Sequence, residues 1–571
     1  MTAPLRPTLR ASLSAALALG ALAGAPDGAR AQGAPRYHAP TGGPIAPADL
    51  SARLHALAHD TMLGRAAGTE ANVKATDYIA AEFRRAGLEP AGVDGTFFQP
   101  IDLVVTGLQP GAALSADGQA LRLWADFAPV APVEGVFRFG AGLRAEGGVP
   151  VVFGGRIGGE TIAPAQAAGK LVVLLPAAGA EEYRFWRHPA MPWYPEAAGV
   201  AVASLESTPA NILEFFQEEQ KELAEGERTE PTGAGGIVIT RAAAARLLGA
   251  DPASLRPGAA GKSVRGGFRF GTRPAPVPAR NVVAVLRGSD PALRGQYVVV
   301  GAHNDHEPPL SRALDHDSVR AFNRVMRPQG ANDPVTVPTP QQAARIAALR
   351  DSMRAARGGV KMDSIMNGAD DDGSGTVTLI EIAEWLASRP QRPKRSVLFV
   401  SHTAEEIGLY GSRFFTDHPT VPRDSIVAAL NMDMVGRGRA EEVKGGGPRY
   451  IQIIGSRRLS TQLGDLVDAV NGRRAEPMDI DYSWDAPGHP LNRYCRSDHF
   501  SYARYGIPIT YFSLGYHVDY HQVGDEPQYI DYDHMARVAT FVGDVAAAIA
   551  DRPERLVVDK PKPDPNAPCR Q

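Results

Sequence analysis

Two kinds of hydrophobic pattern divide the chain. Between residues 47 and 91, apolar residues recur at helical spacing, which predicts two amphipathic helices separated by a short segment at residues 64–70. From about residue 97 to residue 270, the pattern changes to short runs rich in Val, Ile and Leu that are broken by glycine-rich turns. Such runs are typical of strands, so this part is predicted to be a β-rich insertion. It ends at a proline-rich connector, residues 272–279.

Strands and helices alternate after this connector. Strands that are apolar on both faces and alternate with helices indicate a sheet covered by helices on both sides. The predicted fold class is α/β, with a mixed central sheet sandwiched by helices and an inserted β-rich domain. The strands are expected at residues 281–286, 297–303, 396–402, 427–435, 451–455 and 507–513, and helices at 375–388 and 532–550.

The patterns predict a discontinuous domain organisation. One polar stretch interrupts the alternation of strands and helices, contains a helix-like segment at residues 341–357, and is interpreted as a long insertion. The Pro-rich C-terminal tail is expected to be disordered. The predicted parts are a main domain at residues 40–100 and 275–552, an inserted domain at 101–274, the long insertion at 307–366 and the tail at 553–571.

The N-terminal residues have the pattern of a secretory signal peptide. Arg6 and Arg10 precede an apolar run at residues 11–25, and a small-x-small site ends at Ala31. We therefore expect residues 1–31 to be removed near Ala31 and the protein to be secreted or periplasmic; a disordered Ala-rich tail is the alternative. No later stretch has the 18 or more apolar residues needed to span a bilayer, so no membrane span is expected.

Composition and cysteine content add little to this picture. The formal net charge of -3 gives no sign of a nucleic-acid partner, and none is expected. The oligomeric state stays open. The two cysteines, Cys495 and Cys569, could form one disulfide in an oxidising compartment, but the sequence does not place them within bridging distance.

Candidate chemistry lies where the predicted strands stop. In an open α/β sheet, ligands bind outside the carboxyl ends of the strands. Helix capping or a solvated acidic loop could explain some of the polar residues there, but five motifs in order are harder to explain in this way. The motifs are GAHNDH at residues 301–306, NGADDDGSG at 367–375, HTAEEIGLYGS at 402–412, NMDMVGR at 431–437 and DYHQVGDEP at 519–527.

Together these motifs supply the donors for a metal centre. His303 and Asp305 share a predicted strand face, so the imidazole can bind a metal while the carboxylate orients it. Asp433 lies in an otherwise apolar strand, where an unpaired carboxylate would be costly. Imidazoles and carboxylates without thiolates suit zinc, although cobalt or manganese could use the same ligands. The carboxylate-rich set favours a pair of ions over one.

The ordered motifs, together with SDHF at residues 497–500, resemble the two-zinc aminopeptidases of metallopeptidase family 28. The resemblance covers about residues 50–99 and 279–550 and implies the zinc-dependent exopeptidase fold, which is phosphorylase/hydrolase-like. It implies that Asp371 bridges both zinc ions. The ligands implied for one ion are His303 and Asp433, and those for the other are Glu406 and His521.

The same resemblance implies the roles of three further residues. Glu405 resembles the general base that deprotonates a metal-bridging water, Tyr520 resembles a hydroxyl that stabilises the oxyanion, and Asp305 resembles the residue that supports His303. The β-rich insertion resembles a protease-associated (PA) domain in two short stretches, residues 169–175 and 197–205.

The expected function is that of an exported zinc exopeptidase that removes N-terminal residues from peptides. A carboxypeptidase or dipeptidase of the glutamate carboxypeptidase type is the alternative, and a basic cluster formed by Arg437, Arg493 and Arg496 would favour it. A catalytically inactive binding protein on the same fold is a remote alternative.

The long insertion departs from the family pattern. It could form a lid, a substrate wall or a subunit contact. Its polar residues at the start could suggest a third metal site, but we expect solvated loop residues instead. These residues are His306, Asp315, His316 and Asp317.

Overall fold

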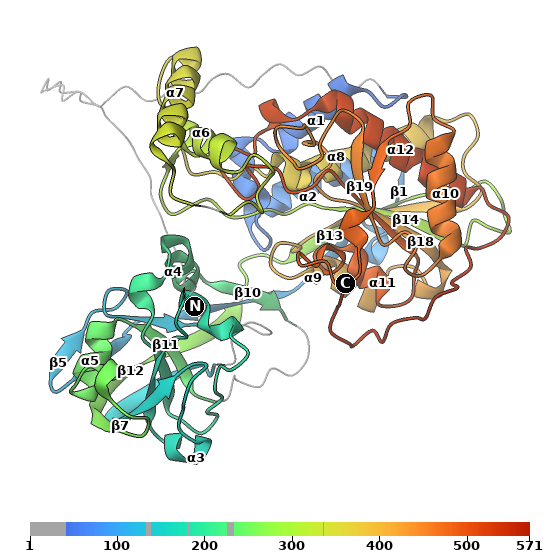
Figure 1. The fold of residues 1–571 in the computed structure, drawn as a ribbon. Coiled ribbons are helices and arrows are strands. Elements are labelled where there is room, and N and C mark those ends of the chain that lie inside the picture. Colours follow the sequence, from blue (N-terminus) through green and yellow to red (C-terminus); the bar gives the residue numbers. More distant parts are fainter. Residues whose placement is uncertain (1–41, 133–138, 180–181, 225–232, 335) are drawn as a thin grey trace, which may run out of the picture. The chain divides into compact units, whose positions relative to one another are not determined.

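The apolar runs of the main domain form one mixed sheet. The computed structural model describes residues 42–571 except 133–138, 180–181, 225–232 and 335, so the predicted signal peptide lies outside the described residues. Within the described part, nine strands pair in the order β1, β13, β17, β14, β18, β21, β19 and β20, with β2 also paired to β13 (Figure 1). Their bounds are β1 Glu89–Pro90, β2 Phe98–Ile101, β13 Ala279–Leu286, β14 Tyr297–His303, β17 Ser396–His402, β18 Ile426–Met432, β19 Tyr450–Ile454, β20 Asp479–Asp481 and β21 Ile509–Ser513.

Four neighbouring strands of this sheet are parallel. β14 pairs with β17 on one side and β18 on the other, and β18 pairs with β21. The flanking strands β13 and β19 run antiparallel to β17 and β21. Because the four central strands point the same way, their carboxyl ends meet at one edge of the sheet.

Helices cover both faces of this sheet, as the apolar strands predict. Side chains alternate along β14: Val298 and Val300 belong to the core on one face, and Val299 belongs to the core on the other. Burying each such side chain stabilises the fold by about 1.5–3 kcal/mol. One face is covered by α1 Pro47–Leu57, α2 Glu70–Arg85, α8 Gly375–Ser388, α10 Thr461–Gly472 and α12 Tyr532–Ala550, and the other by α9 Tyr410–Asp417 and α11 His499–Ala503.

The β-rich part of the chain forms a second sheet with its own core. Ten strands pair in the order β10, β3, β12, β7, β8, β9, β11 and β6, with β4 beside β12 and β5 beside β4. Two apolar clusters pack on this sheet without a strand of the first sheet. The bounds are β3 Leu103–Leu108, β4 Ala113–Ala116, β5 Gln119–Leu121, β6 Phe127–Val130, β7 Gly142–Arg156, β8 Leu171–Leu175, β9 Gly199–Val202, β10 Gln220–Leu223, β11 Gly235–Ile239 and β12 Ala260–Pro274, with helices α3 Pro164–Ala167, α4 Ala210–Gln217 and α5 Arg241–Leu248.

The long insertion contains more structure than its sequence pattern predicts. Besides the expected helix, here α7 Pro340–Arg357, it holds α6 His316–Met326 and a short pair of strands, β15 Leu314–Asp315 and β16 Met362–Asp363. Asp315 caps α6, since its Oδ1 accepts the backbone N–H of Ser318 at 3.3 Å.

The C-terminal tail is ordered, and the expectation of a disordered tail is wrong. Cys495 and Cys569 form a disulfide that links positions 74 residues apart. Beyond it, Gln571 accepts the backbone N–H of Tyr494 through Oε1 at 3.1 Å and donates through Nε2 to the carbonyl of Trp484 at 2.5 Å. The covalent link and these bonds hold a segment whose composition alone suggests disorder. Among the described residues, no helix is long and apolar enough to cross a membrane.

We predict that replacing both cysteines by serine releases the tail. A disulfide that closes a long loop contributes about 2–4 kcal/mol, so the free energy of unfolding should fall by that order. Denaturant unfolding checks this change, and limited proteolysis followed by mass spectrometry checks where the chain is cut. A tail that stays as resistant to protease as in the parent protein would contradict the prediction.

Candidate metal centre

The carboxyl ends of the four parallel strands carry most of the predicted site residues. His303 is the last residue of β14, and Glu405 and Glu406 follow β17. Asp433 lies one residue beyond β18, so it is not inside the strand as expected, although it is still buried. His521 lies in the loop after β21.

Asp371 reaches the same place by another route. It does not follow a strand of this sheet, which corrects the expectation that all five motifs do so. It lies in the turn Ala369–Ser374, immediately before α8. This turn contacts β14, and the turn therefore brings a carboxylate to the end of the strand that carries His303.

The predicted ligands gather into two adjacent groups. One contains His303, Glu405 and Asp433; the other contains Asp371, Glu406 and His521, together with His306. In each group the candidate ligand atoms lie within 4.8 Å of one another. The structure thus brings together all five residues predicted as metal ligands.

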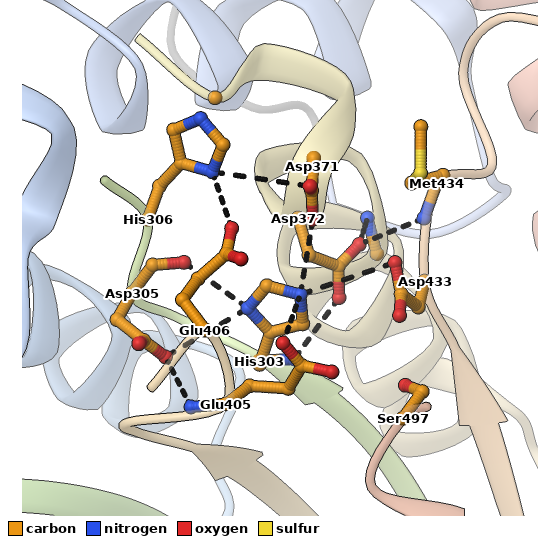
Figure 2. Close-up of polar contacts among 12 residues, drawn as sticks. His303, Asp305, His306, Asp371, Asp372, Glu405, Glu406, Asp433, Met434 and Ser497 are labelled. Carbon is orange, nitrogen blue, oxygen red and sulfur yellow. Dashed lines mark hydrogen bonds and ion pairs between the residues drawn. The ribbon is translucent and has the colours of Figure 1, made fainter. Parts of the chain in front are cut away.

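Asp371 lies between the two groups. Its Oδ1 is 3.2 Å from Nε2 of His303, and its Oδ2 is 3.0 Å from Nε2 of His521. Figure 2 shows this carboxylate above the imidazole of His303, with Glu405 and Asp433 beside that ring. One oxygen facing each histidine is the arrangement of a carboxylate that can bridge two metal ions.

The donors of this centre fit divalent cations. Within the described part of the chain, Nε2 of His303 and Nε2 of His521 are buried and have no hydrogen-bond partner. Burial, together with the charge of Asp371, raises the pKa of Asp433 to about 6. Burial and the charges of Asp433 and Glu406 also raise the pKa of Glu405 well above its ordinary value. Buried carboxylates beside unpartnered imidazole nitrogens are stabilised by bound cations, and this donor set suits zinc.

The three consecutive aspartates before α8 have different contacts. Asp372 accepts three backbone N–H groups, from His303 and Gly375 at 2.9 Å and from Met434 at 3.2 Å. Asp370 accepts the N–H of Gly436 at 2.6 Å. Only Asp371 faces both histidines. Capping therefore accounts for part of this motif, because Asp372 binds the first turn of α8.

Asp305 supports the site differently from the expected strand-face contact. β14 ends at His303, so the two residues do not share a strand face. Nδ1 of His303 donates to the backbone carbonyl of Asp305 at 3.1 Å, while the carboxylate Oδ1 is 3.7 Å away. That carboxylate accepts the backbone N–H of Glu405 at 3.1 Å. Asp305 thus contacts His303 through its main chain and Glu405 through its side chain.

Four polar residues at and near the start of the long insertion are predicted to be solvated. That prediction is wrong for three of them. His306, His316 and Asp317 are buried, and Asp315 is the cap of α6. His306 lies beside the second group of ligands, with Nδ1 2.6 Å from Oε1 of Glu406. Its place three residues after His303, within the same motif, is the signal that could have identified it.

The insertion also holds both ends of the loop that carries His521. At one end, Arg320 of α6 donates to Asp519 at 2.6 Å. At the other end, Glu526 pairs with Lys361 and lies 3.2 Å from Nε2 of His316. The insertion is thus fixed to the loop at residues 519–526 by buried polar contacts.

A pocket opens onto the two groups. It has a volume of about 240 Å³, and its lining includes carboxylates as well as aromatic and basic side chains. The ring of Tyr520 lies between those of His521 and Tyr516, with centroids 4.0 Å and 4.7 Å away. The lining residues are Asp371, Glu405, Glu406, Gly408, Leu409, Asp433, Met434, Arg496, Tyr516, Tyr520 and His521.

The fold is an α/β sandwich, and two adjacent groups of metal ligands lie at one edge of its sheet. These features are typical of proteins with a dinuclear metal centre. Residues 281–546 match the family model described as Peptidase family M28. This range includes all five predicted metal ligands. This part of the chain is therefore similar to the proteins of peptidase family M28.

Three curated relatives each match about a third of the chain. Leucine aminopeptidase 1 of Paracoccidioides brasiliensis (strain Pb18) is 32% identical over 181 residues, which are 30% of this chain and 44% of the relative. Leucine aminopeptidase 1 of Sclerotinia sclerotiorum is 30% identical over 181 residues, with the same coverage. A probable zinc metalloprotease of Pyricularia oryzae is 28% identical over 224 residues, 33% of this chain and 43% of the relative. The matches thus span less than half the length of these relatives.

Among solved structures, an aminopeptidase from Aneurinibacillus sp. strain AM-1 is 16% identical, with a TM-score of 0.49. The comparison covers 91% of this chain and 97% of that structure.

We predict that Asp371→Asn removes bound metal. The parent protein, loaded and desalted, should hold about two ions per chain, and the variant should hold fewer than about one, because it loses the negative charge between both groups. Elemental analysis by mass spectrometry measures the metal content. Asp351→Asn, the same change at an exposed position on α7, is the matched control. Equal metal content in both variants would contradict the bridging position.

Proposed function

We propose that this protein is an exported zinc-dependent aminopeptidase that removes N-terminal residues from peptides. The observation that carries the proposal is Asp371 between His303 and His521, in a segment that matches Peptidase family M28. Curated relatives of the chain are named leucine aminopeptidases, which supports the choice of substrate end.

Two zinc ions fit the two groups of ligands. His303 and Asp433 would hold one ion, Glu406 and His521 the other, and Asp371 both. When bound, zinc ions polarise a peptide carbonyl and acidify a water molecule. Side chains of the protein carry out the remaining steps, which are proton transfer and stabilisation of the oxyanion.

Glu405 is the proposed general base. Its carboxylate lines the pocket, 3.9 Å from Nε2 of His303, and its raised pKa suits a group that both takes and returns a proton. It would accept the proton of the attacking water and pass it to the leaving amine. The ring of Tyr520 packs against those of His521 and Tyr516, and its hydroxyl would donate a hydrogen bond to the oxyanion.

The arginine contacts favour aminopeptidase over carboxypeptidase activity. Arg437 is buried and pairs with Glu442 at 2.6 Å, and Arg493 is buried and donates to Tyr511 at 3.1 Å. Of the three arginines in the predicted basic cluster, only Arg496 lines the pocket. The pocket therefore offers a single arginine, and not the predicted basic cluster, to a C-terminal carboxylate.

We predict that Glu405→Gln keeps its metal but loses activity. A general base contributes about 10²–10⁴ in rate, so hydrolysis of aminoacyl-anilides should fall by that factor while elemental analysis finds unchanged metal. N-blocked peptides serve as the control substrates and should resist the parent enzyme. Normal turnover by the variant would remove Glu405 from the mechanism, and cleavage of the blocked peptides alone would favour the carboxypeptidase alternative.

Export is a separate prediction. When the full chain is produced in a bacterium with a Sec system, the protein outside the cytoplasm should begin near Gln32, because a small residue at Ala31 precedes the cleavage site. Intact-mass measurement of the periplasmic and cytoplasmic fractions tests this. Ala31→Arg should leave the leader attached. An unprocessed parent chain found only in the cytoplasm would exclude the signal peptide.

A further inference from the structure

A third imidazole lies beside the metal centre and has no part in the proposed reaction. The side chain of His306 is 1% exposed, and it approaches the group formed by Asp371, Glu406 and His521. In Figure 2 its Nδ1 points toward Glu406, on the side of that carboxylate away from His303.

Glu406 divides its two oxygens between two histidines. Its Oε1 lies 2.6 Å from Nδ1 of His306, and its Oε2 lies 3.1 Å from Nε2 of His521. An ionised carboxylate can only accept, so Nδ1 of His306 is the donor of the short bond. A hydrogen bond to a carboxylate is stronger than one between neutral groups, and it fixes the rotation of the acceptor.

The distances identify His306 as a support and not as a ligand. Two ligands of one tetrahedral zinc, each about 2.0 Å from the ion, lie about 3.3 Å apart. Nε2 of His521 meets this spacing, at 3.0 Å from Asp371 and 3.1 Å from Glu406. Nδ1 of His306 does not, because it lies only 2.6 Å from Oε1 of Glu406, which is the distance of a hydrogen bond and too short for two ligands of one ion.

The backbone holds the ring of His306 in place. Gly368 has a φ of +53°, and a Cβ added there would lie 2.4 Å from Cγ of His306. Only glycine allows the chain before Asp371 to pass so close to the ring. The imidazole is therefore packed against the turn that carries Asp371.

We infer that His306 is a positioning residue for one of the two metal sites, the site formed by Asp371, Glu406 and His521. Its Nδ1–H holds Oε1 of Glu406 and leaves Oε2 free to face the ion. This inference rests on the zinc centre of the proposed function. It predicts an effect on one site only, because within the described part of the chain the ion pairs of His306 are with Asp371 and Glu406 and not with His303 or Asp433.

The test is a metal titration that needs no peptidase assay. Protein stripped with a chelator is titrated with Zn²⁺ against a competing indicator, and two dissociation constants are fitted. Loss of a group that orients a ligand weakens metal binding by about 10–100-fold, so His306→Ala should weaken one site by that factor and leave the other nearly unchanged. His306→Asn, which places an amide donor near the former Nδ1, should restore most of the affinity.

The control is another buried histidine. His534 is buried and bonds the carbonyl of Tyr450 at 2.8 Å, so His534→Ala should lower the melting temperature without changing either dissociation constant. Equal weakening of both sites by His306→Ala, or no weakening, would overturn the inference. Loss of one site altogether without rescue by Asn would make His306 a ligand and overturn it too. A parent protein that binds no zinc would instead overturn the proposed function.

Discussion

The structure depends on balancing charge at the carboxyl ends of four parallel strands. Buried carboxylates whose oxygens lie within 4.8 Å of one another cannot all stay ionised unless donors or cations compensate their charge. Backbone N–H groups compensate part of the charge: Asp372 binds three of them, and Asp525 binds those of Asp370 and Asp371. Asp371, Glu405 and Asp433 have too few such donors. Their charge is the part that metal ions would neutralise.

This division explains why one acidic motif contains three neighbouring residues with different surroundings. Asp370 and Asp372 fasten the turn to residues after β18 and to β14, and they thereby set the direction of Asp371. Asp305 does similar work for two residues at once, since its carbonyl holds His303 and its carboxylate holds Glu405. The ligands are thus directed by contacts that are mostly with the main chain.

Much of this fold could be predicted from sequence because its strands are strongly apolar, and the pattern that identifies each strand or helix lies within its own residues. The predicted helices at residues 375–388 and 532–550 and the strand at 396–402 agree with the observed bounds. Asp371, Glu405, Glu406 and Asp433 could be found because each lies close to the end of a strand or the start of a helix. Tyr520 and His521 lie in a loop well after β21, and the resemblance of their motif to the family pattern is what identified their roles.

Other features depend on contacts between distant parts of the chain. His306 contacts Glu406, and His316 contacts Glu526, and in each pair the two residues are far apart in sequence. The order of the tail depends on Cys495 finding Cys569. No local pattern encodes such pairings. The resemblance of the β-rich insertion to a PA domain rests on two short stretches of sequence. The separate sheet of this insertion accounts for the change in hydrophobic pattern near residue 97.

The polar contacts between the long insertion and the loop at residues 519–526 have a consequence for redesign. Arg320 and Lys361 hold the two ends of that loop, and His521 lies between them. The insertion and the loop are therefore one module and would have to be transplanted or trimmed together. A shorter chimera that kept His521 but lacked the long insertion would retain every ligand and still lose the contacts that direct one of them.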